Sequence, residues 1–187
     1  EIVAEFVLAS DEVSANNKQS ISTFGILANL VPENTKHNFG FENDFNQFGW
    51  TSEDTDGDDR TWMKYDDATL AKTGTSFATS FPNLKVQNSD WMFSNPVKLK
   101  ANTLYRVIFQ TRKFRTLNEK LQLAIGKSPN SASMTTNIGP EIAPTDAYVK
   151  KVIEFTPTED DIYYIGFHHY TGAGEQSYAI FVDDASI

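Results

Sequence analysis

"LYRVIFQTRKF", at residues 104–114, alternates apolar and polar side chains over most of its length. Tyr105, Val107 and Phe109 fall on one face of an extended chain, and most of the charged and amide side chains fall on the other. A period of two is typical of a β-strand with one buried face, because successive side chains point to opposite sides. The stretch therefore predicts a strand, with Phe109 in the core.

Four further segments have the composition of strands bounded by turn residues. They are "EKLQLAI" (119–125), "VKKVIEF" (149–155), "DIYYIGFHHY" (161–170) and "SYAIFVDDASI" (177–187). Several strands that are apolar on one face, with turns between them, favour a two-sheet antiparallel β-sandwich over a parallel α/β fold. The predicted core residues are Trp91, Phe109, Leu123, Ile165 and Val182.

One segment near the N-terminus has helical spacing. In "SISTFGILANLVPE" (20–33), apolar residues recur every three or four positions from Ile21 to Val31, and Pro32 supplies a stop. Gly25 weakens this pattern, which predicts no more than a short helix. Residues 1–38 share no pattern with the rest. We therefore divide the chain into 1–38, an N-terminal extension or the end of an upstream module, and 39–187, the sandwich domain.

The composition limits the classes of partner. Of the 187 residues, 40% are hydrophobic and 13% aromatic, which is ample for a core. The net charge of -9 argues against a nucleic-acid partner and leaves carboxylates available for calcium. The chain has no cysteine, and no apolar run approaches the roughly 18 residues of a membrane span. "EIVAEFV" at the start has no basic region, so we expect the chain to be part of a larger polypeptide.

The sequence has no pattern that indicates catalysis. It lacks cysteine and a G-x-S-x-G motif, and its three histidines, His37, His168 and His169, have no zinc-binding spacing. Adjacent residues of a strand point to opposite faces, so His168 and His169 cannot share a metal. Among 25 acidic residues, some pair will have the separation of a glycosidase site by chance. We therefore expect a protein that is not an enzyme.

An acidic stretch, "DTDGDDRTW" (54–62), places Asp54, Asp56 and Asp58 at alternate positions, as in an EF-hand loop. An EF-hand also needs glycine at its sixth position and glutamate at its twelfth, where this chain has Asp59 and Tyr65. An EF-hand is therefore excluded. A hairpin tip rich in Asp and Gly, or a loop that holds calcium loosely, both remain open.

Five motifs in order carry a family resemblance: "FENDFNQFGW" (41–50), "DTDGDDRTW" (54–62), "SDWMFSNPVKL" (89–99), "YYIGFHHY" (163–170) and "IFVDDASI" (180–187). Together they resemble the cleaved-adhesin family, the adhesin modules of gingipain-type proteins, and the related choice-of-anchor J domains of Bacteroidetes. The resemblance covers residues 41–187. Two departures stand out: "LAKTGTSFATS" (70–80) keeps Gly74 and Ser76 without the family's acid, and His168 replaces an arginine.

The resemblance implies a jelly-roll β-sandwich, related to MAM and galactose-binding-like domains. It also implies a structural calcium where the first core strand meets the last. Glu42 lies at the start of this region and Asp183–Asp184 at its end, with Asp90 as a further candidate ligand. Since Asp183 and Asp184 face opposite sides of an ideal strand, we expect only one of them to bind directly. Asp54, Asp56 and Asp58 are a second, weaker candidate site.

The function that the resemblance implies is a non-catalytic adhesin-type binding module, secreted or on a bacterial surface. Its partner would be a carbohydrate or protein of the host or the environment. Candidate ligand-binding residues are His168, Tyr170 and Tyr178, with loops at 131–145 and 171–176, because binding residues concentrate on loops of a rigid scaffold. Two alternatives remain open: a ligand-free structural spacer of a larger surface protein or peptidase, and a hydrolase with a shallow acidic cleft.

Overall fold

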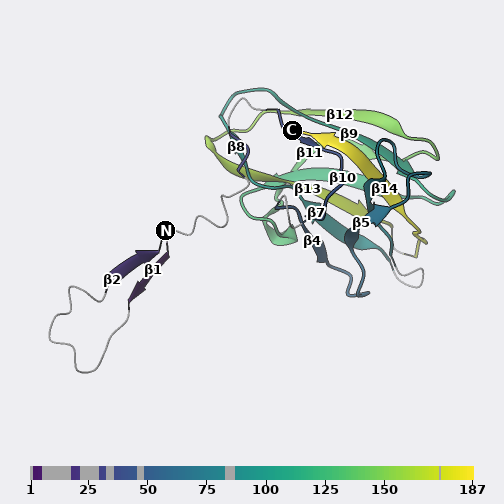
Figure 1. Ribbon diagram of the computed structural model, residues 1–187, viewed down its shortest axis with the longest axis horizontal. Coiled ribbons are helices and arrows are strands. Elements are labelled where there is room, and N and C mark those ends of the chain that lie inside the picture. Colours follow the sequence, from purple (N-terminus) through teal and green to yellow (C-terminus); the bar gives the residue numbers. More distant parts are fainter. Residues whose placement is uncertain are drawn as a thin grey trace.

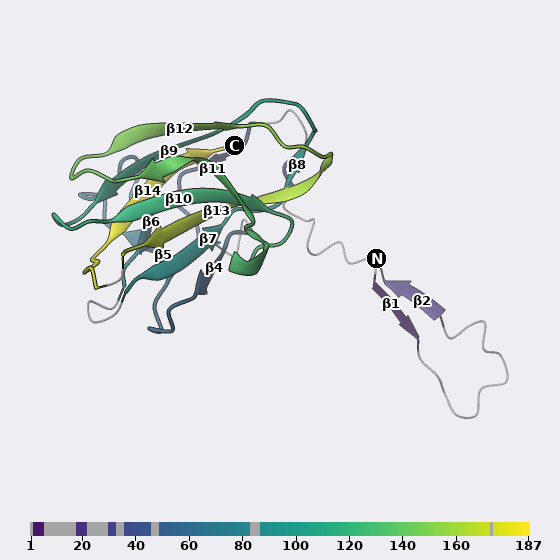
Figure 2. The ribbon, with the colours of Figure 1, turned by 180° about the vertical axis from the view of Figure 1, so that it is seen from behind.

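The protein is built from strands that form two facing sheets, as the computed structural model shows in Figures 1 and 2. The structure describes residues 2–5, 18–21, 30–32, 36–45, 49–82, 87–172 and 174–187. In these segments the longest helical element is the 3-10 helix η4 (Ser131–Ser133), and no helix is long and apolar enough to cross a membrane. The predicted two-sheet antiparallel sandwich is therefore confirmed.

The sheet that contains β13, called the β13 sheet below, has the strand order β11-β10-β13-β7-β4, and β8 also pairs with β13. Every paired strand in it runs antiparallel to its neighbour. Its members are β4 (Thr51–Asp54), β7 (Ser89–Phe93), β8 (Val97–Leu99), β10 (Lys120–Gly126), β11 (Thr136–Ile142) and β13 (Asp161–Tyr170).

The opposite sheet, called the β14 sheet, has the order β12-β9-β14-β6-β5, with β3 paired to β14. Its strands are β3 (Asn38–Phe39), β5 (Trp62–Asp66), β6 (Ser76–Ser80), β9 (Tyr105–Lys113), β12 (Val149–Phe155) and β14 (Ile180–Ser186). The C-terminal strand thus lies in the middle of its sheet, between β9 and β6. A third, two-stranded sheet consists of β1 (Ile2–Glu5) and β2 (Lys18–Ile21).

The core lies between the two large sheets. In β9 the side chains of Val107 and Phe109 are buried, as the alternation predicts. The ring of Phe109 packs edge-on against Phe167 of β13, with centroids 5.3 Å apart, and such aromatic pairs add to the area that they bury. All five predicted core residues are buried, although Trp91 belongs to a separate cluster with Phe93 and Met134.

Two local predictions from the sequence are wrong. Residues 54–62 are not a hairpin tip, because β4 and β5 belong to different sheets and the segment crosses between them. Residues 131–145 are not one long loop, because they include η4 and the strand β11. The second error has a simple cause: β11 contains Gly139 and Pro140, and proline is tolerated in a strand at the edge of a sheet.

The predicted N-terminal helix falls mostly on residues 22–29, which lie outside the described residues. At its ends, Ile21 belongs to β2, and Val31 makes a parallel bridge to Val97. Backbone pairing with the sandwich therefore begins before residue 39. It continues at His37, whose backbone exchanges hydrogen bonds with Ile187, at 3.0 and 3.1 Å.

Candidate functional site

The outer face of the β14 sheet carries an aromatic groove of about 390 Å³. We call it the Tyr178 groove. Its lining residues are Met63, Tyr65, Leu70, Thr79, Phe81, Phe114, Tyr178, Ala179 and Phe181. Three of them expose large apolar side chains: Met63 is 50% exposed, Tyr65 47% and Phe114 41%. Exposed aromatic side chains in a hollow are typical of a ligand-binding surface.

Strand alternation builds the floor of the groove. Ile180 and Val182 of β14 point into the core, so Phe181 between them points outward. Phe181 pairs in register with Thr79 of β6, which pairs with Met63 of β5. The same alternation places Trp62 in the core and Met63 on the outer face. A row of outward side chains therefore crosses three adjacent strands.

The wall of the groove is a set of packed rings. Tyr178 meets Phe81 edge-on, with centroids 4.9 Å apart, and stacks on Phe114 at 5.7 Å. The guanidinium of Arg115 lies 4.2 Å from the centre of the Tyr178 ring, and that of Arg60 lies 5.5 Å from the centre of Phe81. Cations over aromatic faces are attracted by the ring quadrupole, which orders both partners.

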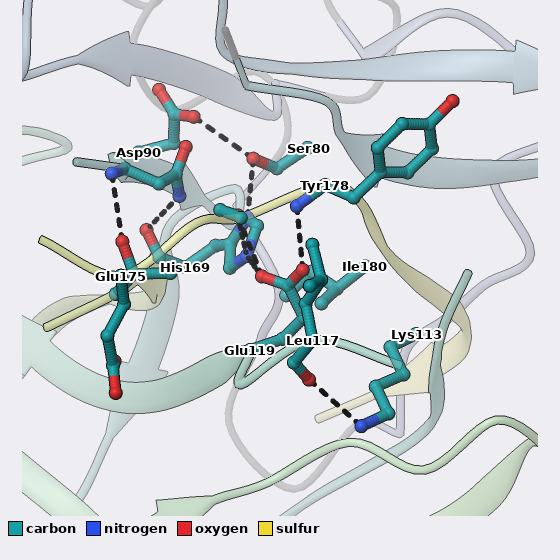
Figure 3. A network of polar contacts seen from close by, with 12 residues as sticks. Ser80, Asp90, Lys113, Leu117, Glu119, His169, Glu175, Tyr178 and Ile180 are labelled. Carbon is teal, nitrogen blue, oxygen red and sulfur yellow. Dashed lines mark hydrogen bonds and ion pairs between the residues drawn. The ribbon is translucent and has the colours of Figure 1, made fainter. Parts of the chain in front are cut away.

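A buried chain of hydrogen bonds holds the backbone next to this wall (Figure 3). The amide of Tyr178 donates to Oε1 of Glu119 at 2.7 Å. Oε2 of Glu119 lies 2.8 Å from Nε2 of His169. Nδ1 of His169 lies 2.7 Å from Oγ of Ser80, which donates to Oδ2 of Asp90 at 3.0 Å. The chain thus runs from the groove through the sandwich to β7.

Burial has opposite outcomes for the two acids of this chain. Burial alone would raise the pKa of Glu119, but hydrogen bonds from His169, Ser177 and the Tyr178 amide hold that pKa below its ordinary value. For Asp90, burial prevails over the hydrogen bond from Ser80 and raises the pKa to about 7, and nearby acidic charges add to this. One end of the chain therefore stays ionised while the other readily takes up a proton.

Three of the predicted calcium ligands surround the turn at residues 72–76. Glu42 accepts hydrogen bonds from the amides of Thr75 and Ser76 at 3.1 and 3.2 Å. Asp183 accepts from the amides of Lys72 and Thr73 at 2.9 and 3.2 Å. Asp184 accepts from the hydroxyl of Thr73 at 2.6 Å.

The pKa values of Asp183 and Glu42, the two main acids at this turn, shift in opposite directions. Burial raises the pKa of Asp183 to about 6, against the pull of the backbone amides. For Glu42 the slight burial acts upward, but hydrogen bonds from Thr75 and Ser76 prevail and lower the pKa. The turn thus gathers Glu42, Asp183 and Asp184, whereas Asp90 lies in β7 and bonds to Ser80 instead.

The weaker candidate set is the one that the structure brings closest together. Ligand atoms of Asp54, Asp56 and Asp58 all lie within 4.8 Å of one another, and no other group of three such residues does so in the described part of the chain. Asp90 lies opposite Asp54 in the β4–β7 pair. Its Oδ1 is buried without a hydrogen-bond partner among the described residues. Burial, and then the charges of Asp58 and Asp54, raise the pKa of Asp56.

The predicted ligand residues fall on two different surfaces. Tyr178 lines the groove. His168 and Tyr170 lie on the outer face of the β13 sheet instead, where His168 stacks on Trp91 with ring centroids 4.2 Å apart. Burial, and then His169, lower the pKa of His168 to about 4. Tyr170 donates a hydrogen bond to Glu141.

Sequence reasoning missed most of the groove. The signal for Phe114 is its position at the end of residues 104–114, directly after the strand, where an aromatic ring does not contribute to the core. Met63 and Tyr65 were available as the alternate residues of "WMKYD" (62–66). These local signals do not predict which aromatic side chains lie together in the folded chain, because the residues come from four separate segments.

Comparison with known proteins places the fold. No family model matches the chain, and no curated protein matches it. A cleaved adhesin domain of Lys-gingipain from Porphyromonas gingivalis is similar, with a TM-score of 0.65 and 15% identity over 81% of this chain and 96% of that domain.

Two carbohydrate-binding modules share the same architecture. The module TmCBM61, solved with β-1,4-galactotriose, has a TM-score of 0.51 and 18% identity over 76% of this chain and 91% of its own. A family 11 module from Clostridium thermocellum was solved with a β-1,3-1,4-mixed-linked tetrasaccharide. It has a TM-score of 0.54 and 16% identity over 81% of this chain and 94% of its own. The chain therefore has the jelly-roll fold of cleaved adhesin and carbohydrate-binding modules, as the motif order predicted.

Proposed function

We propose that this chain is a secreted or cell-surface module that binds carbohydrate in the Tyr178 groove, without catalysis. The observation that carries this proposal is the cluster of exposed apolar side chains in a hollow: Met63, Tyr65 and Phe114. Leaving large rings in water loses the free energy that burial would give, about 1.5–3 kcal/mol for a side chain of the size of Phe. A ligand that covers them recovers it.

Saccharides suit this surface. The apolar face of a pyranose ring stacks on an aromatic side chain, and amphipathic tyrosine supplies both a ring face and a hydroxyl. Phe114, Tyr178 and Tyr65 all line the groove, so a chain of sugars in it would have several rings to stack on. Two modules with this fold were solved with oligosaccharides bound, which supports the choice of carbohydrate over protein.

Recognition without catalysis is consistent with the lining residues. Among the residues that the structure describes, no acidic residue lines the groove, whereas glycoside hydrolysis by the usual mechanism needs two carboxyl groups, about 5–10 Å apart, flanking the bond. The acid nearest to Tyr178 by hydrogen bonding, Glu119, is buried and engaged with His169 and Ser177. It supports the wall of the groove and does not face a ligand.

We also propose that calcium stabilises the module. Oxygen ligands suit this hard cation, and the first candidate site is the turn at 72–76, where Glu42 and Asp183 would hold it with backbone carbonyls. The second candidate is the cluster of Asp54, Asp56 and Asp58, whose mutual repulsion a cation would relieve. At either site calcium supplies positive charge only, and it has no part in recognition.

A glycan array followed by calorimetry tests the binding proposal. Phe114→Ala and Tyr65→Ala should each weaken binding of an array hit about tenfold, as expected for ring contacts that carry the binding energy. Leu104→Ala is the matched control, because Leu104 is 55% exposed but lies outside the groove. Absence of binding to any glycan, with the fold intact, would favour the structural spacer. Binding that survives both groove variants would place the site elsewhere.

A further inference from the structure

The Tyr178 groove continues into a second hollow of different chemistry. Tyr178 lines both, and the second hollow, of about 320 Å³, is otherwise lined by Arg115, Thr116, Leu117 and Gln176. The groove itself is mainly aromatic, whereas this extension offers a guanidinium, a hydroxyl and an amide. A chain-like ligand lying over Tyr178 would therefore pass from an apolar surface to a hydrogen-bonding one.

The charge of this surface is opposite to that of the whole chain. The sequence has 25 acidic and 16 basic residues, yet none of the described acidic residues lines either hollow. Within the described residues, Arg115 forms no ion pair with a carboxylate. Its guanidinium is instead held against the ring of Tyr178, 4.2 Å from the centroid. A cation thus remains available beside the aromatic wall.

The turn that carries Arg115 is well braced. Leu117 donates its amide hydrogen to the carbonyl of Arg115 at 2.8 Å, and the ammonium of Lys113 donates to the carbonyl of Leu117 at 2.9 Å. The amide of Phe114 donates to the carbonyl of Ala179 at 3.0 Å, next to Tyr178. These bonds fix Arg115 in relation to the groove, so that little conformational entropy would be lost when a ligand binds.

We propose that the groove recognises an anionic saccharide, whose rings cover Phe114 and Tyr178 and whose carboxylate or sulfate group pairs with Arg115. This inference rests on the proposed function and names its ligand class. A planar guanidinium binds a carboxylate or sulfate through two parallel hydrogen bonds, which a neutral hydroxyl cannot match. Gln176 and Thr116 supply donors for the neighbouring hydroxyl groups.

Calorimetry with four probes tests the proposal: a uronic-acid oligosaccharide, a sulfated oligosaccharide, a neutral oligosaccharide of equal length, and a polyglutamate peptide. The wild-type chain should prefer one of the two anionic saccharides over the neutral one by about fivefold to tenfold. The carboxylate and sulfate probes distinguish the two sources of charge. Raising the salt concentration should weaken binding of the anionic probe more than that of the neutral probe.

Variants at Arg115 separate charge from geometry. Arg115→Gln should abolish the preference for the anionic probe over the neutral one, and Arg115→Lys should restore only part of that preference. Arg106→Gln removes the same charge from β9, where Arg106 pairs with Glu154 instead, and should leave the preference unchanged.

Several results would overturn the proposal. Equal affinity for the neutral and anionic probes would refute the anionic ligand while leaving carbohydrate binding intact. An unchanged preference in Arg115→Gln would refute the pairing of the anionic group with Arg115. Stronger binding of polyglutamate than of either anionic saccharide would indicate an acidic peptide as the ligand. Failure to bind any saccharide would refute the proposed function as well.

Discussion

Ser80 of β6 and His169 of β13 join the two sheets of the sandwich through a hydrogen bond of 2.7 Å between Oγ and Nδ1. Both side chains are fully buried. Such a pair is costly to desolvate unless every polar atom finds a partner. Here Asp90 completes the chain on one side and Glu119 on the other. The same chain of hydrogen bonds ends at the amide of Tyr178, so it links the buried interior to a residue that lines the groove.

Glu119→Gln should destabilise the protein by about 3 kcal/mol, because a buried carboxylate that accepts hydrogen bonds on both oxygens is replaced by an amide with one acceptor oxygen. His169 and Ser177 would lose their carboxylate acceptor. Urea denaturation measures the change. The matched control is Glu154→Gln, whose partner Arg106 is exposed, and which should cost about 0.5 kcal/mol or less. Equal effects of the two variants would show that the buried chain contributes no special stability.

The stability of the fold should depend on pH through Asp90. Burial raises its pKa from 3.8 to about 7, so the folded chain holds a proton that the unfolded chain has released at pH values between these two. The contribution of Asp90 to the free energy of unfolding is therefore largest at low pH, and it falls as the pH rises towards 7. The expected loss is on the order of 2 kcal/mol between about pH 5 and pH 8.

Asp90→Asn should remove that loss, because an amide does not titrate and its oxygen can still accept the hydrogen bond from Ser80. Asp183, with a pKa raised by burial to about 6, contributes in the same direction only below that value. His168, whose pKa burial lowers to about 4, acts in the opposite direction up to about pH 6.5, so the difference in slope between the wild type and Asp90→Asn reports Asp90. Denaturation curves at several pH values, with exposed Asp146→Asn as control, measure it. A slope that persists in Asp90→Asn would assign it to another group.

Much of the fold could be predicted because strand periodicity is a local property. The side chains of β9 and β10 alternate by themselves, and β13 has a run of aromatic and aliphatic residues that is buried over most of its length. β11 escaped prediction because it is an edge strand with glycine, proline and few apolar residues. Its strand conformation comes from pairing with β10.

The candidate site was only partly predictable, since alternation tells which face a residue occupies but not which sheet. Tyr170 and Tyr178 are eight positions apart, yet they end on the outer faces of opposite sheets. The acids show the same limit: Glu42 and Asp183 accept hydrogen bonds from different amides of the turn of residues 72–76, whereas Asp90 lies in the other sheet. For the tyrosines and for the acids alike, the tertiary fold determines which residues lie together, and the local sequence pattern does not specify it.

Calcium should raise the melting temperature of demetallated protein, because an ion that binds only the folded state adds RT ln(1 + [L]/Kd) to its stability. We expect Asp183→Asn to abolish the rise and Asp56→Asn to retain it, if the ion binds at the turn of residues 72–76. The reverse pattern would assign it to Asp54, Asp56 and Asp58. Identical melting curves in excess calcium and in EDTA would contradict both sites, and magnesium serves as the control cation.

Two glycines test how the turn of residues 72–76 holds Glu42. Gly74 and Gly57 both have positive φ, at 65° and 76°, so alanine at either position costs about 1 kcal/mol of backbone strain. A Cβ at Gly74 would also lie 2.1 Å from Oε1 of Glu42, whereas a Cβ at Gly57 meets nothing within 4 Å. Gly74→Ala must therefore displace the carboxylate.

That displacement breaks the hydrogen bonds from Thr75 and Ser76 to Glu42, which should add about 1 kcal/mol to the cost of Gly74→Ala. Urea denaturation should thus give about 2 kcal/mol for Gly74→Ala and about 1 kcal/mol for Gly57→Ala. In a Glu42→Ala background the contact is gone, so the two glycine variants should cost the same, and the difference between backgrounds is the coupling energy. A cost of Gly74→Ala that does not change with Glu42→Ala would show that backbone strain alone requires glycine in this turn.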